Sequence, residues 1–140
     1  MALTAGICNS YKAEILAGNH TSAHTYKIAL FTSAATLGEG TTAYSTSNEV
    51  STVASGYTAG GATLSGFAVN LDTSVAILDF ADVTYSTATF SARGALIYNA
   101  SVANKAVCVL DFGSDIAASN GSFTITFPSS GAATGLIRIA

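Results

Sequence analysis

Short segments rich in branched and aromatic residues recur along this 140-residue chain, and residues that favour turns separate them. Segments of this kind, spaced by roughly ten residues, are typical of antiparallel strands in a β-sandwich or β-barrel. We therefore predict one all-β domain over residues 1–140, with about eight antiparallel strands. The expected strands are 25–32, 62–71, 75–83, 88–90, 92–99, 105–112, 122–127 and 135–140.

Residues 1–18 predict one short N-terminal helix, because apolar side chains recur every fourth position. Thr4 or Asn9 is expected to cap its start, and Gly18 is expected to end it. The apolar stripe has two interpretations: it packs on the domain itself, as single amphipathic helices usually do, or it docks on a neighbouring protein. The stripe consists of Leu3, Ile7, Tyr11, Ile15 and Leu16.

The segment ARGALIYNASVANKAVCVLDFG (92–113) predicts a hairpin, since two apolar runs flank a small polar turn. Arg93, one of only five Lys and Arg residues, begins the first run. We expect it to pair with Asp79, Asp82 or Asp111. The alternative is a contact with a neighbouring subunit, where arginine is a favoured anchor.

Strict alternation in SFTITF places Phe123, Ile125 and Phe127 on one face, and we expect that face to belong to the core. By contrast, residues 33–55 are polar, and the stretch is too long for a structureless loop in a compact domain. A short strand or helical turn is therefore expected near 46–53.

The composition indicates a chain that functions in contact with partner proteins. Charged residues make up 9% of the sequence, against about 25% in an average soluble domain. Ser and Thr together make up about a quarter, and the net charge is -3. A surface of this kind can pack on another protein at a small desolvation cost. Nucleic-acid binding is not expected, because the five cations are scattered along the chain.

No motif in the sequence predicts a catalytic, metal or cofactor site, and we expect a protein that is not an enzyme. His20 and His24 form an H-x-x-x-H pattern, but it follows the expected helix end and has no third ligand beside it. Acidic residues gather in two turns, but they lack the spacing of a calcium-binding loop. Ordinary acidic turn residues are a commoner explanation than a calcium site. Asp79 and Asp82 lie in one turn, and Asp111 and Asp115 lie in the other together with Asn120.

Cys8 and Cys108 are expected to be small buried apolar side chains, although a disulfide between them stays open. The first ten residues, MALTAGICNS, have neither the basic nor the apolar region of a signal peptide. No apolar run is long enough for a bilayer span, so no membrane association is expected.

Four segments in succession resemble small structural proteins of tailed bacteriophages, and most closely their capsid cement, or decoration, proteins. The resemblance covers nearly the whole chain from about Tyr26. The segments are YKIALFTSAATLGEGTTAYSTSNEV, GYTAGGATLSG, ARGALIYNASVANKAVCVLDFG and GSFTITFPSSGAATGLIRI.

This resemblance implies a jelly-roll-like β-sandwich that is made in the host cytoplasm and located on the capsid surface. It also implies binding across neighbouring major capsid protein subunits, with self-association as a homodimer or homotrimer. A tail or fibre module that binds host-surface glycans is the alternative, since six tyrosines and acidic loops could support sugar binding. The candidate interface residues are Ile7, Tyr11, Ile15, Tyr44 and Arg93.

Overall fold

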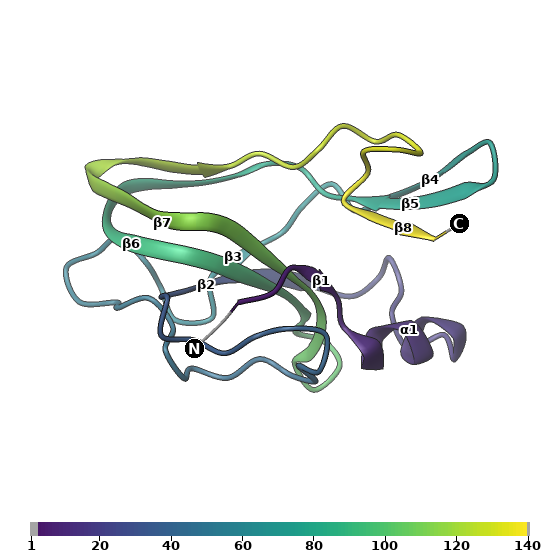
Figure 1. The fold of residues 1–140 in the computed structure, drawn as a ribbon, viewed down its shortest axis with the longest axis horizontal. Helices are drawn as coiled ribbons and strands as arrows, with labels where there is room; N and C mark the ends of the chain where they lie inside the picture. Colours follow the sequence, from purple (N-terminus) through teal and green to yellow (C-terminus); the bar gives the residue numbers. More distant parts are fainter. Residues whose placement is uncertain (1–2, 140) are drawn as a thin grey trace.

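The computed structural model, described here for residues 3–139, contains two antiparallel sheets and one short helix (Figure 1). The larger sheet has the strand order β1-β7-β6-β2-β3, and the smaller has the order β4-β5-β8. The predicted all-β sandwich-like fold with about eight antiparallel strands and one short helix is confirmed. The elements are β1 (Gly6–Ile7), α1 (Asn9–Leu16), β2 (Tyr26–Phe31), β3 (Ala62–Thr63), β4 (Ala68–Asp72), β5 (Val75–Asp79), β6 (Val83–Asn99), β7 (Lys105–Ile125) and β8 (Ile137–Ile139).

Strands β6 and β7 form one long hairpin within the large sheet, and the hairpin folds back over itself (Figure 1). Its far half thereby makes a second layer over the half that pairs with β1 and β2. The bend coincides with register shifts in the ladder, and β-bulges of this kind curve a strand. The layers are joined through Tyr85, whose hydroxyl donates to the Ile28 carbonyl at 3.0 Å and accepts from the Ala62 amide at 3.2 Å.

The predicted boundaries inside this hairpin were wrong. Segments 88–90 and 92–99 are parts of β6, and segments 105–112 and 122–127 lie within or at the end of β7. The turn expected between the two apolar runs is confirmed at 100–104, where Asn99 pairs with Lys105.

The predicted strand 62–71 was also wrong, because it divides between the two sheets. Its start, β3, pairs with β2, and its end, β4, pairs with β5. Gly66 lies at the division with a φ of 70°, and a Cβ there would lie only 3.1 Å from Ala81. The left-handed backbone at this close approach turns the chain out of one sheet and into the other.

The helix is shorter than predicted. Ile7 belongs to β1 and Leu3 makes an isolated bridge to Leu37, so neither is helical. Cys8 rather than Thr4 or Asn9 is the N-cap residue, and it provides no side-chain cap. Gly18 ends the helix as expected: its φ is 78°, its N–H bonds the Ile15 carbonyl, and the next N–H bonds that of Glu14.

The core lies between the layers and is confirmed at the alternating strand 122–127. Phe123, Ile125 and Phe127 are all buried, and the Phe123 ring centroid lies 5.0 Å from that of Phe90. Cys8 and Cys108 are buried free thiols, as expected. Burial raises the pKa of the Cys8 thiol to about 11 and that of Cys108 higher still.

Residues 33–61 run over the large sheet without forming a regular strand. The short element expected near 46–53 is present only as a single bridge, in which Glu49 pairs with Phe31. The amide of Val50 also donates to the Leu30 carbonyl at 2.9 Å. These contacts attach the segment to the edge of β2.

Candidate binding surface

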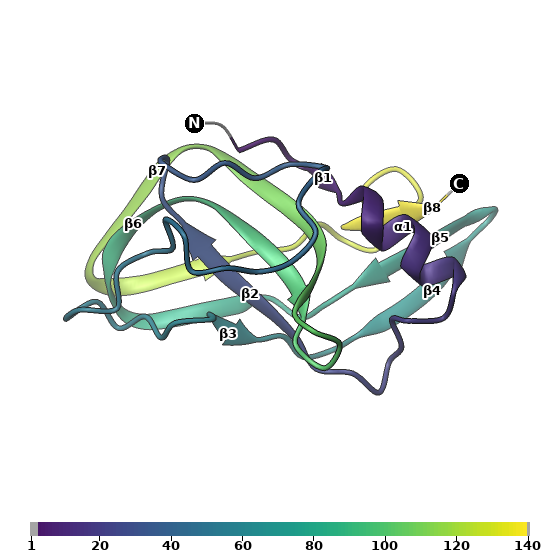
Figure 2. The same ribbon diagram turned by 90° about the horizontal axis from the view of Figure 1, so that it is seen from below.

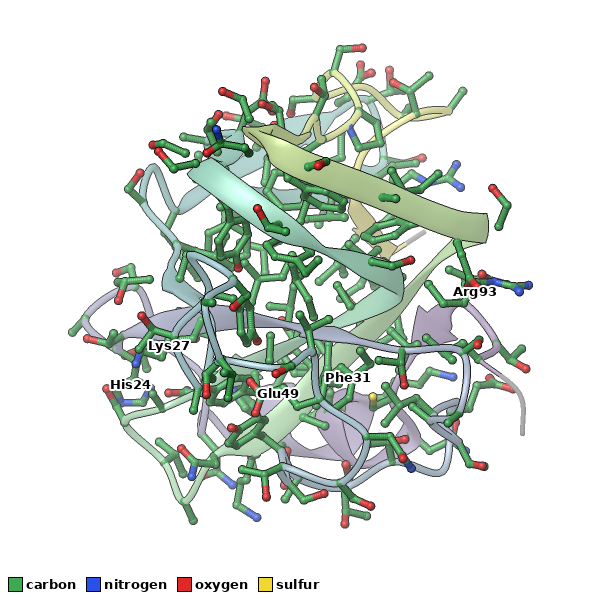
Figure 3. All side chains as sticks on the ribbon, turned by 90° about the vertical axis from the view of Figure 1, so that its left-hand side faces the viewer. His24, Lys27, Phe31, Glu49 and Arg93 are labelled. Atoms are coloured by element: carbon green, nitrogen blue, oxygen red, sulfur yellow. The ribbon has the colours of Figure 1, made fainter. Side chains whose placement is uncertain are left out.

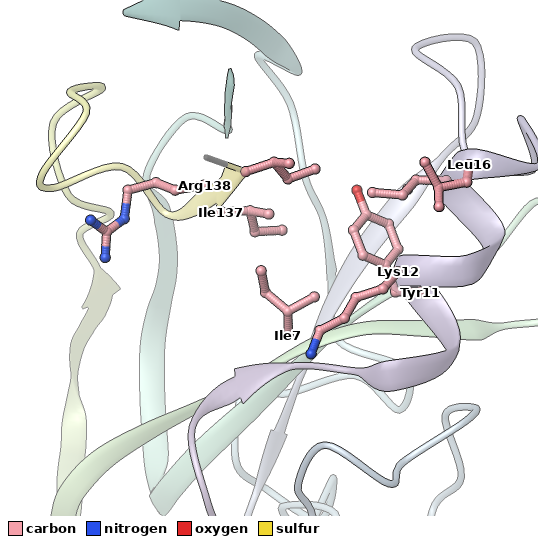
Figure 4. A pocket seen from close by; sticks show the side chains of 8 residues that line it. Ile7, Tyr11, Lys12, Leu16, Ile137 and Arg138 are labelled. Carbon is pink, nitrogen blue, oxygen red and sulfur yellow. The ribbon is translucent and has the colours of Figure 1, made fainter. Parts of the chain in front are cut away.

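An apolar groove lies between α1 and β8, and we call it the α1–β8 groove (Figure 4). Its volume is about 320 Å³. Three of the five candidate interface residues meet in it, because β1 and α1 present them to the same side. The lining residues are Ile7, Tyr11, Lys12, Ile15, Leu16, Ile137, Arg138 and Ile139.

Helix α1 both packs on the domain and offers apolar surface to solvent. Packing on the domain is confirmed for part of the stripe, and docking on a neighbouring protein stays a prediction. Tyr11 is buried, and its ring centroid lies 4.8 Å from that of His20. Burial raises its pKa well above the ordinary tyrosine value. Ile15 is half-buried, whereas Leu16 is 90% exposed. The exposed Leu16 marks the rim of the groove.

The small sheet carries one continuous apolar face toward α1. The register places Val69, Leu78 and Ile137 side by side, and the next row contains Leu71, Ala76 and Ile139. The helix covers this face only in part and leaves a cavity of about 160 Å³ beneath it. Consequently Val69, Leu71 and Ile139 are 63%, 72% and 49% exposed.

A polar network fixes α1 to the turn end of the β6–β7 hairpin. The Glu14 carboxylate binds the His20 ring and the Lys105 ammonium, each at 2.9 Å. The buried Asn99 amide contacts Nδ1 of both His20 and His24, at 3.1 and 3.0 Å. Burial alone would raise the pKa of Glu14, but hydrogen bonds from His20 and Lys105 hold it below its ordinary value.

The two histidines therefore act in this network. Within residues 3–139, no three His, Cys, Asp or Glu side chains gather as a metal site. Asp79 and Asp82 likewise bind the backbone of the domain: each accepts an N–H at 2.9 Å, from Phe80 and Phe127 respectively.

Tyr44, a candidate interface residue, belongs to a cluster around Glu49 that the sequence did not reveal. One Glu49 oxygen accepts from the Tyr44 hydroxyl at 2.7 Å, and the other accepts from the Tyr57 hydroxyl at 2.6 Å and the Gly60 amide at 2.8 Å. The Tyr44 ring stacks on Tyr98 with centroids 4.5 Å apart. Burial and the neighbouring carboxylate raise the pKa of Tyr44 and Tyr57. The burial of these tyrosines and their hydrogen bonds to Glu49 indicate that the cluster stabilises the fold.

Arg93 pairs with Asp111, one of the three partners expected for it, at 3.0 Å. Figure 3 shows Arg93 at a margin of the molecule, away from Glu49. Hydrogen bonds from the Gly113 amide and from Arg93 lower the pKa of Asp111. Arg93 forms this ion pair across the two strands, and its side chain is still 34% exposed to solvent.

A second apolar depression, which we call the β7 notch, lies on the far half of the hairpin and has a volume of about 230 Å³. Phe123 closes it from the core, and Ile116 is 41% exposed. It shares no lining residue with the α1–β8 groove. The lining residues are Phe112, Ile116, Phe123, Thr124, Ile125 and Thr126.

Five of the six tyrosines are buried, and only Tyr44 has a partly exposed ring. The tyrosines thus offer little surface on which a sugar could stack. No helix within residues 3–139 has the length and apolar character needed to cross a bilayer. Comparisons with protein-family models, curated proteins and solved structures found no match.

Proposed function

We propose that this chain is a virion structural protein of a tailed bacteriophage. It acts as a capsid cement protein that binds the outer shell across neighbouring subunits of the major capsid protein. The observation that carries the proposal is the pair of separate apolar surfaces, the α1–β8 groove and the β7 notch. A protein that bridges two neighbours needs at least two contact surfaces on one rigid body.

The surrounding surface supports the same proposal. Charged residues make up only 9% of the chain and none of them lines the β7 notch, so a contact there buries few charges that would need partners. The α1–β8 groove carries two cations in its lining, Lys12 and Arg138. Ser, Thr and Asn side chains and the backbone can supply hydrogen bonds at the rim of an interface. The apolar centre contributes more of the free energy, about 1.5–3 kcal/mol for each fully buried Ile or Leu side chain.

Cement action follows from many such contacts in a symmetric shell. Each copy adds an interface that must break before two capsid subunits separate. Because the copies are repeated over the shell, modest single affinities combine into strong total binding. No bond needs to be made or broken, so the reinforcement is passive.

The first test is the copy number of the chain in purified phage particles, measured by quantitative mass spectrometry against the major capsid protein. We expect a ratio within a few-fold of one. A few copies per particle, or none, would contradict the cement function and direct attention to the tail.

A second test uses shells that lack the chain and are then mixed with purified protein. Wild-type protein should bind and raise the temperature at which the shells open. Ile116→Lys should bind more weakly without changing the melting temperature of the free protein, because its side chain is already 41% exposed. Val53→Lys is the matched control: Val53 is 81% exposed and lines neither surface.

A further inference from the structure

The small sheet ends in two open edges, β4 on one side and β8 on the other. The edges of the large sheet are different: β3 spans two residues, and residues 37–39 cover β1 through hydrogen bonds to the Thr4 and Asn9 amides. Exposed edge strands are sites where a further strand can pair, and proteins usually block them with charge, proline or brevity. Two open edges on one sheet call for an explanation.

Strand β4 has the properties of a strand that is donated to a neighbour. All five of its residues are exposed, and it contains no proline or lysine. Val69 and Leu71 form an apolar row on one face and are 63% and 72% exposed. The β4–β5 hairpin projects from one end of the molecule in both ribbon views (Figures 1 and 2). Residues 130–132 contact its polar side chains: Asn70 donates to the Ser130 hydroxyl and Asp72 accepts from the Ala132 amide.

Strand β8 has the properties of an acceptor. Its open edge borders the α1–β8 groove, and Ile137 and Ile139 extend the apolar face of the sheet into that groove. On the opposite wall, Leu16 is 90% exposed (Figure 4). A free edge beside apolar side-chain pockets is the arrangement that binds an added strand.

We propose that the occupant is a second copy of this chain, whose β4 pairs with β8 and continues the small sheet from one molecule into the next. An antiparallel register places Val69 and Leu71 of the second copy opposite Ile139 and Ile137. Their side chains then enter the groove and cover Leu16. Within residues 3–139, six large apolar side chains are exposed in the single chain, and four of them thereby become buried.

Charge complementarity on the other face of the sheet supports this occupant. The register places Asn70 and Asp72 on the face opposite the apolar row, and Arg138 lies on that same face of β8. The new pairing therefore brings Asp72 of the second copy diagonally across from Arg138, within reach of its long side chain. Both residues are exposed, and neither has an ion-pair partner within the described residues. Each makes one hydrogen bond to the backbone of Ala132, which Asp72 accepts at 2.8 Å and Arg138 donates at 3.2 Å, so both keep polar atoms for the new contact.

The interface joins two different surfaces, so each copy can donate on one side and accept on the other. Such head-to-tail contacts close into a ring or extend as a chain, depending on the rotation between copies. This inference does not depend on the proposed function, because self-association is measured on the purified chain without any shell. The pairing occupies the α1–β8 groove, so in the cement proposal the body with at least two contact surfaces is then the assembled pair, which keeps one β7 notch on each copy.

Sedimentation of the purified chain tests the proposal. The wild-type protein should form species larger than one 14.0 kDa chain as its concentration rises. The donor variant Leu71→Lys and the acceptor variant Leu16→Lys/Ile139→Lys should each weaken association at least about tenfold. Both alter exposed side chains, and the melting temperature of each variant will show that it folds. A wild-type chain that stays monomeric up to about 1 mM would overturn the proposal.

Mixing the two variants gives the decisive result. The donor variant keeps an intact groove and the acceptor variant keeps an intact β4, so the mixture should form a one-to-one dimer that neither forms alone. A mixture that stays monomeric would refute head-to-tail pairing. An acceptor variant that still dimerises alone while the donor variant does not would indicate pairing between two β4 edges instead, and would also refute it.

The ion pair is tested by charge reversal. Arg138→Glu and Asp72→Arg should each weaken association about two- to fivefold, and the double variant should recover most of the loss. If the losses of affinity of the two single variants simply multiply in the double variant, Asp72 and Arg138 do not form an ion pair across the interface. Val53→Lys serves again as the control and should associate like the wild type.

Discussion

Replacing Glu49 with alanine should lower the free energy of unfolding by about 2–4 kcal/mol. Its carboxylate accepts hydrogen bonds from two groups that the fold removes from water, the Tyr57 hydroxyl at 2.6 Å and the Gly60 amide at 2.8 Å. A hydrogen bond to a charged group contributes about 1.5–3 kcal/mol, and a donor left unpaired in the interior has its own cost. In the alanine variant, folding no longer removes the half-buried carboxylate from water. The absence of that desolvation cost offsets part of the lost hydrogen-bond energy.

Urea unfolding followed by tyrosine fluorescence gives the measurement, with an unchanged slope as the sign that only stability changed. Glu49→Gln keeps one acceptor and should cost less than Glu49→Ala. Glu39→Ala is the matched control, because that side chain is 59% exposed and its contact with Lys12 is 3.8 Å long; it should change stability by less than about 0.5 kcal/mol.

A double-mutant cycle with Tyr57→Phe separates the network from simple loss of contacts. The Tyr57 hydroxyl also accepts from the Leu30 amide at 2.9 Å, so it links Glu49 to β2. The two substitutions should therefore be non-additive by more than about 0.5 kcal/mol. Additive effects, or a Glu49→Ala cost equal to that of the control, would refute the argument that this carboxylate holds the segment onto the sheet.

Three further predictions concern the core, acid stability and the thiols. Phe123→Ala should cost about 3–5 kcal/mol in the same unfolding assay, and a cost below about 1 kcal/mol would place its ring outside the core. Because the folded-state pKa of Glu14 is lowered, its contribution is present above the ordinary carboxyl pKa and lost as the pH falls through the folded value. Glu14→Gln should therefore show a shallower loss of unfolding midpoint on acidification than wild type. Cys8 and Cys108, buried and with raised pKa values, should not react with a thiol reagent at pH 8 until the protein unfolds; fast labelling of the folded protein would contradict their burial.

The sequence predicted the class of fold because alternation and turn residues are local signals. The interior row of Phe123, Ile125 and Phe127 and the hairpin turn at 100–104 were visible in that way. The boundaries failed where tertiary structure overrides local pattern. Bulges let β6 and β7 bend without ending, so each was divided in the prediction, whereas Gly66 turns the chain between sheets inside what looked like one strand.

Spacing misled the prediction at the N-terminus. Leu3 and Ile7 continue the four-residue repeat of α1, yet Ile7 belongs to β1 and Leu3 forms an isolated bridge with Leu37. Apolar positions four apart also share one face of a strand, so the spacing alone could not distinguish strand from helix. Ile7, Tyr11 and Ile15 nevertheless line one groove, and their role as interface residues stays a prediction.

The remaining parts of the surface carried no local signal. Val69, Leu71 and Ile139 were expected to be ordinary strand residues, and only the small sheet's incomplete cover leaves them exposed. Glu49 looked like one acidic residue in a polar loop, and its partners come from separate parts of the chain.

The doubled-back hairpin also imposes an order on folding. Partners beside the 100–104 turn are a few residues apart in sequence, while Val83 and Ile125 are the most distant pair in the ladder. Since closing a loop costs more entropy as it lengthens, pairing should start at the turn and extend outward. The first layer would then exist before the second is laid over it, and transient openings should begin at the far ends. Amide hydrogens near Leu96 and Val109 should accordingly exchange last.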